Sequence, residues 1–166
     1  MSAPTSPSIR GALSAANVTP IAKPAIKLDA LGIGFANVVQ FLTLARVFED
    51  IGVTAYAGAA GLPVVANSPY IGTAARILAA EAEHVGNIRL QVARLNISTA
   101  ALDGVDIIPS PSGQKFISVD AATGLSAIRT PGQVLYLAYG NAANATSGGF
   151  FPMGVNGTIN MSSAAA

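Results

Sequence analysis

Three polar residues stand at positions where the surrounding pattern calls for apolar side chains. Glu49 lies one turn after Ala45 and one turn before Val53, within the apolar stripe of a helical repeat. Glu81 and His84, the latter the only histidine, occupy the same kind of position in a second helical stretch and form a Glu-x-x-His motif. Burying an unpaired carboxylate is costly, so such groups are neutralised, paired or bound to a metal ion.

A glutamate on one helix and a Glu-x-x-His motif on the next are half of the ligand set of di-iron and di-manganese proteins built on four-helix bundles. The full set has four glutamates and two histidines, which two copies of this chain would supply. The pattern therefore indicates Glu49, Glu81 and His84 as ligands of iron or manganese shared between chains. A metal-free interpretation stays open, in which Glu49 hydrogen-bonds His84 or faces a water-filled seam, because Glu and His at this spacing are common by chance.

Two long helices are expected to position these residues, over about 35–59 and 69–96, with a connection short enough to make them antiparallel neighbours. Gly61-Leu62-Pro63 ends the first, and Ser68 with Pro69 is expected to cap the second. The first helix carries two apolar stripes, with Arg46 and Asp50 on the side that remains. A helix that is apolar on two faces must be covered on two faces, so this hairpin is predicted to be half of a four-helix bundle.

Less regular segments flank the predicted hairpin. Residues 1–34 are punctuated by prolines and are predicted to form an extended arm. Residues 97–166 carry many turn signals and are predicted to wrap irregularly, with a strand-like run at Phe116–Val119 and a short helix over about 131–139 that Thr130-Pro131 caps. Phe150, Phe151 and Met153 favour a tail that lies against a surface. The fold is thus predicted to be mainly α-helical.

Composition narrows the choice of partners. Only 10% of the 166 residues are charged, against about 25% in an average soluble domain, and 51% are hydrophobic. Much of the surface is therefore expected to be covered by other copies of the chain, in a homodimer or a larger homo-oligomer. The net charge of +1 gives no basis for nucleic-acid binding. The longest uncharged stretches are too short, or too interrupted by glycine and proline, to predict a membrane span.

Four ordered blocks of sequence resemble segments of a known family, the ferritin-like proteins that include the desiccation-related proteins of plants and their bacterial and fungal relatives. The blocks are residues 48–56 (FEDIGVTAY), 77–84 (ILAAEAEH), 130–135 (TPGQVL) and 148–152 (GGFFP) with Asn156-Gly157.

The resemblance implies a ferritin-like bundle in which Glu49, Glu81 and His84 occupy ligand positions, and it favours an exported protein. Family members usually carry an earlier helix pair with further ligands, so the chain is expected to be either a half-length form that self-associates or a fragment. No signal peptide is recognised at the N-terminus. Five Asn-x-Ser/Thr triplets give only a slight further indication of export.

Two functions follow. The first is a metal-binding or redox protein with a di-metal carboxylate site assembled between chains, for which Tyr56, two turns after Glu49, is a candidate neighbour. The second is a metal-free structural protein that uses the hairpin to build a filament, cage or surface layer. No catalytic residue is assigned, and both interpretations favour binding or assembly over enzymatic catalysis.

Overall fold

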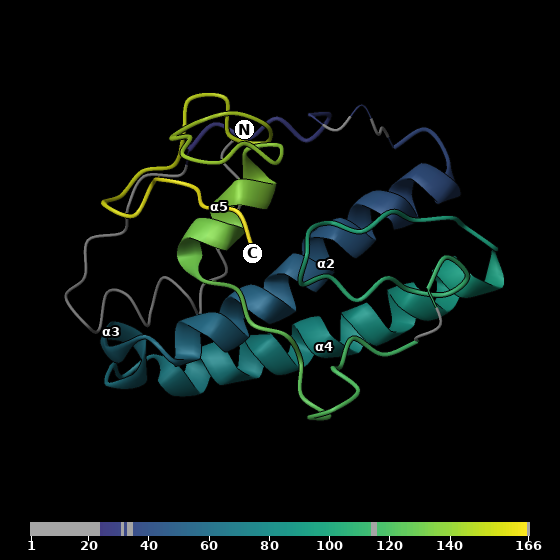
Figure 1. The fold of residues 1–166 in the computed structure, drawn as a ribbon, viewed down its shortest axis with the longest axis horizontal. Helices are drawn as coiled ribbons and strands as arrows, with labels where there is room; N and C mark the ends of the chain where they lie inside the picture. Colours follow the sequence, from purple (N-terminus) through teal and green to yellow (C-terminus); the bar gives the residue numbers. More distant parts are fainter. Residues whose placement is uncertain (1–23, 31, 33–34, 114–115, 166) are drawn as a thin grey trace.

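The computed structural model describes residues 24–30, 32, 35–113 and 116–165. Within these ranges the helices are α2 (Val38–Ala60), α3 (Pro63–Ala66), α4 (Ile71–Arg94) and α5 (Pro131–Ala138). Figure 1 shows α2 and α4 lying side by side as an antiparallel hairpin, with α5 packed against α2. The described residues form no β-strand, only an isolated bridge between Gly148 and Phe151. The prediction of a mainly α-helical protein built on a helical hairpin is confirmed.

Local capping interactions set the helix ends, but some of the residues that cap the helices differ from those predicted. Asn37 caps α2 because its side-chain oxygen accepts a hydrogen bond from the Gln40 amide at 3.0 Å, and Gly61 ends the helix as predicted. The expected cap of α4 was wrong. The Ser68 hydroxyl donates to the Val65 carbonyl at 2.8 Å, in the last turn of α3, and α4 begins only at Ile71.

Arg46 and Asp50 lie outside the two apolar stripes of α2, yet both are buried. Each is only 2% exposed. The Asp50 carboxylate lies 2.9 Å from Arg46 Nε and accepts from Arg89 of α4 at 2.8 and 3.0 Å. Arg46 also donates to Asp106, and Arg89 donates to the Ile107 carbonyl at 2.7 Å. The chain that follows α4 therefore folds back over this side of the hairpin, and its Asp106 supplies a second carboxylate to balance the two arginines.

A second buried arginine network fixes the start of α5. The Arg129 guanidinium donates twice to Asp103, at 2.6 and 2.8 Å, and once to the Thr54 hydroxyl at 2.6 Å. The Arg129 amide also donates to the Thr54 carbonyl at 3.0 Å. Gly58 permits this contact, since a Cβ there would overlap the Arg129 carbonyl. Thr130 then starts α5 with a complete capping box, so the predicted short helix is confirmed.

The irregular C-terminal segment departs from prediction in two places. Phe116–Val119 forms neither a β-strand nor a β-bridge, and Phe116 and Ile117 are exposed. The tail lies against the hairpin at Phe150, which is buried and pairs with the Phe48 ring at 4.9 Å, whereas Met153 is exposed. In the predicted arm, the backbone N–H of Lys27 donates a hydrogen bond to the Phe150 carbonyl at 2.8 Å. The predictions for residues 1–23 lie outside the described residues.

No helix among the described residues is both long and apolar enough to cross a membrane.

Candidate metal centre

The structure brings all three predicted site residues together at the middle of the hairpin. Glu49 projects from α2, and Glu81 and His84 project from α4. His84 Nδ1 lies 3.1 Å from Glu49 Oε2, and the Glu49 and Glu81 carboxyls share a hydrogen bond. The side chains of Glu49 and His84 are 25% and 60% exposed. The cluster thus lies at the edge of the α2–α4 interface, where solvent or another chain has access to it.

Gly52 makes room for this arrangement. It lies on α2 three residues after Glu49, and a Cβ at this position would overlap the Glu81 carboxylate. Glycine inside a helix destabilises it by about 0.5–1 kcal/mol relative to alanine. The sequence signal for this close approach was an isolated glycine within a helical pattern, and it was not recognised.

The environment of Glu81 favours its protonated form. The pKa of the Glu81 carboxyl is raised from 4.5 to about 7. Partial burial is the largest cause, and the hydrogen bond and negative charge of Glu49 also raise this pKa, while His84 lowers it. In the metal-free chain the Glu81 carboxyl is therefore about half protonated at pH 7 and more fully protonated at lower pH. Burial also raises the pKa of the Tyr56 phenol, and the negative charge of Glu81 adds to that effect, so Tyr56 is a neighbour of the cluster as anticipated.

The donor set suits a divalent metal ion in kind but not in number. Two carboxylates and an imidazole are ligands that iron and manganese accept. The three buried arginines pair with aspartates, so none of them neutralises Glu49 or Glu81. Among the described residues, however, no group of three or more His, Cys, Asp or Glu side chains is placed to hold a metal ion within one chain.

An apolar hollow of about 330 Å³ opens beside Glu49. It is lined by Leu28, Phe35, Phe41, Leu44, Ala45, Phe48 and Glu49. Phe41 and Phe48 are exposed there, although Leu44 is buried. The described chain thus leaves apolar surface uncovered next to the carboxylates.

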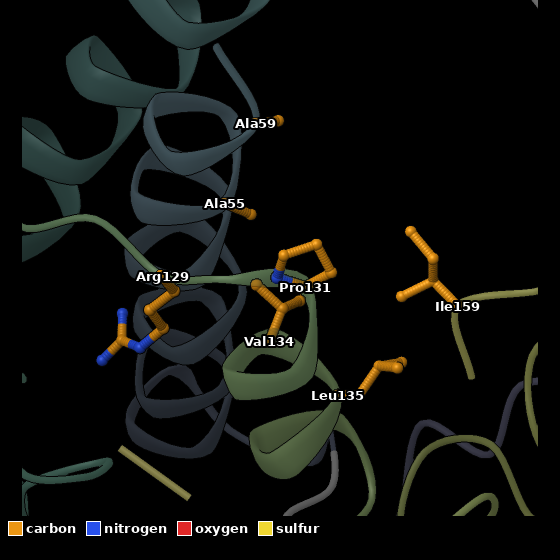
Figure 2. Close-up of a pocket in the computed structure, with 7 residues that line it drawn as sticks. All are labelled: Ala55, Ala59, Arg129, Pro131, Val134, Leu135 and Ile159. Carbon is orange, nitrogen blue, oxygen red and sulfur yellow. The ribbon is translucent and has the colours of Figure 1, made fainter. Parts of the chain in front are cut away.

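A second cavity, of about 290 Å³, lies between α2 and α5. It is lined by Ala55, Ala59, Arg129, Pro131, Val134, Leu135 and Ile159. Figure 2 shows apolar side chains around this space, with the Arg129 guanidinium turned away from it. Because that guanidinium is bound to Asp103 and Thr54, the described side chains that line this cavity offer no free charged group to a substrate. Glu49, Glu81 and His84 therefore remain the candidate site.

Comparison with protein families supports the helical fold. Residues 8–94, more than half of the chain, match the ferritin-like domain. The chain belongs to the ferritin-like domain family. The matched region includes the whole of α2, α3 and α4, and with them the three clustered side chains. No curated protein and no solved structure is detectably similar to this ferritin-like chain.

Sequence reasoning missed the residue that links the hairpin to the loop covering it. Arg89 is buried and holds both Asp50 and the Ile107 carbonyl. A signal was present, since Arg89 lies four residues after Val85 and three before Val92, both of which are buried. An arginine in an apolar stripe predicts a buried acidic partner, just as Glu49 and Glu81, each in the apolar stripe of its own helix, predicted a histidine or a metal ion.

Proposed function

We propose that this ferritin-like chain pairs with a second copy to complete a four-helix bundle, and that Glu49, Glu81 and His84 of both copies bind two iron or manganese ions between them. The observation that carries the proposal is the convergence of these three side chains at an edge of the hairpin that no described segment fully covers. Two such clusters facing each other supply four carboxylates and two imidazoles.

Two sides of the hairpin are already covered, which restricts how it can pair. The segment after α4 covers the side of Arg46 and Arg89, and α5 covers the side of Thr54. The remaining side carries the cluster, together with exposed Phe41 and Phe48. One patch used by both copies makes an isologous two-fold contact, which closes at a dimer.

Each residue has a distinct role in such a site. Glu49 lies between His84 and Glu81 and would hold a metal ion together with them, while His84 is the most exposed of the three and would face the second copy. Glu81 must lose its proton before it can ligate, so metal binding releases protons near neutral pH. A bound iron or manganese pair would supply redox chemistry towards oxygen or peroxide. Tyr56 adds a phenol next to Glu81.

The sequence blocks that resemble the desiccation-related proteins support a finer assignment. We place the chain in that branch of the ferritin-like family, with an exported location and a part in the response to stress.

A metal-free building block is the second candidate, and one observation favours it. The cluster is already internally compensated, because Glu49 pairs with His84 and Glu81 holds a proton to about pH 7. In this second candidate, the carboxyls would need no metal ion to compensate them. In this case the exposed aromatic residues of α2 would join copies into a filament, cage or layer.

Elemental analysis and solution mass, measured on one native sample, separate these functions. About one iron or manganese ion per chain in a dimer supports the shared site. His84→Ala should then lose metal but remain a dimer, whereas Asn87→Ala, an exposed position one turn further along α4, should keep both. Metal-free particles much larger than a dimer support the assembly role. A metal-free monomer refutes both.

A further inference from the structure

Asparagine triplets of the form Asn-x-Ser/Thr are more frequent in this chain than its composition explains. With nine asparagines and 23 serines and threonines among 166 residues, chance gives about one such triplet. There are five, at Asn17, Asn96, Asn144, Asn156 and Asn160. Asn17 lies outside the described residues. The structure separates the other four by whether the asparagine and the hydroxyl residue are free on the surface.

The triplet at Asn96 follows α4 and presents both of its polar residues to solvent. Asn96 and Ser98 are exposed, while Ile97 between them is buried in a cluster with Leu42 and Val92. Asn96 has a left-handed backbone with φ of 52°, a conformation that asparagine tolerates better than most residues. The anchored Ile97 thus holds the asparagine amide and the serine hydroxyl outward.

The triplet at Asn144 repeats this arrangement in the loop after α5. Asn144 and Thr146 are exposed, and Asn144 again has a left-handed backbone, with φ of 56°. The backbone is held by Ser162, whose carbonyl accepts from the Asn144 amide at 3.0 Å and whose hydroxyl accepts from the Ala145 amide at 2.9 Å. The loop is therefore fixed by its main chain and leaves both side chains to solvent.

The triplet at Asn160 has the opposite arrangement. Its hydroxyl residue is Ser162, which is 1% exposed and donates to the Ala142 carbonyl at 2.6 Å. The Asn160 carbonyl accepts from the Tyr139 hydroxyl at 3.0 Å. This triplet is part of the packing around α5. Asn156 is exposed but takes part in an interaction within the fold.

We infer that Asn96 and Asn144 are N-glycosylation sites, a property that goes beyond the proposed function. The co-substrate is an oligosaccharide carried on a lipid pyrophosphate. The asparagine amide nitrogen forms a bond to the anomeric carbon, the bond from that carbon to the pyrophosphate oxygen breaks, and the amide loses one proton. The lipid pyrophosphate leaves with the electron pair of the broken bond.

Two features of the molecule agree with this assignment. Glycans are bulky and solubilising, and they would hydrate the surface of a chain in which only 10% of all residues are charged. Asn96 also lies twelve residues beyond His84, which is roughly 18 Å along a helix axis. A glycan there leaves the cluster accessible to a second copy.

Peptide mass spectrometry of the chain isolated from its own source, before and after treatment with peptide-N-glycosidase, tests the inference. We expect glycopeptides at Asn96 and Asn144, with both asparagines converted to aspartate by the enzyme, and an unmodified Asn160. Ser98→Ala and Thr146→Ala in the native host should each remove one glycan while keeping the left-handed asparagine, and Asn160→Gln should remove none. Unmodified peptides spanning both Asn96 and Asn144 in the native chain overturn the inference, whatever the metal content.

Discussion

Replacing Glu81 with glutamine keeps the shape of the side chain but removes its ionisation. In the folded chain, partial burial and the neighbouring Glu49 raise the pKa of the Glu81 carboxyl from 4.5 to about 7. The folded state therefore holds more protons than the unfolded state between about pH 4.5 and 7. Since stability falls with rising pH wherever the folded state binds more protons, the metal-free protein loses stability across this window.

The size of the effect follows from the same shift. A pKa difference between 4.5 and about 7 corresponds to at most about 3 kcal/mol of unfolding free energy. Glu81 is only partly buried, so solvent screening reduces the expected effect to about 1 kcal/mol. Below pH 4.5 the carboxyl is protonated in both states and contributes nothing. Glu81→Gln should therefore match the parent at pH 4.5 and exceed its stability by about 1 kcal/mol at pH 8.

Urea unfolding at pH 4.5 and pH 8, with a chelator present to keep both proteins metal-free, measures this difference. Glu83→Gln is the matched control, because Glu83 is exposed two residues further along α4 and should change little at either pH. A Glu81→Gln variant that is no more stable than the parent at pH 8 would refute the reasoning. With manganese added, the unfolding free energy of the parent should rise with pH instead of falling, because the ligands must be deprotonated to bind. The Glu81→Gln variant should not show this reversal.

Three further substitutions test the buried ion pair of the hairpin, the close approach of α2 to Glu81, and the N-cap of α5. Arg89→Met leaves a buried aspartate short of its partner and should cost about 3–5 kcal/mol in urea unfolding, whereas the exposed Arg94→Met should cost less than about 0.5 kcal/mol. Gly52→Ala forces its Cβ into the facing carboxylate, so it should weaken manganese binding measured by calorimetry, while Gly72→Ala, which meets nothing within 4 Å, should leave binding unchanged. Thr130→Ala removes the capping box and should cost about 1 kcal/mol, seen as faster amide exchange in α5.

The two long helices and the short one were predictable because their signals are local. Apolar spacing, the Gly61-Leu62-Pro63 stop and the Thr130-Pro131 start act within a few residues, and they placed α2, α4 and α5 to within about three residues of their ends. The start of α4 was missed because the Ser68 hydroxyl bonds back to α3, a helix too short to show a period. The strand-like run at Phe116–Val119 failed because a strand needs a partner, which no local pattern supplies.

The sequence by itself determined that Glu49, Glu81 and His84 share one face of a helix pair, because helical spacing fixes which residues lie over one another. Only the tertiary structure decided which of the other charged side chains are buried and with which groups they pair. Arg46, Asp50 and Arg89 are buried because Asp106 and the Ile107 carbonyl return from the loop after α4 to pair with them. Such pairing depends on how a loop without regular structure folds back, and the free energy of a buried charge is set by partners distant in sequence.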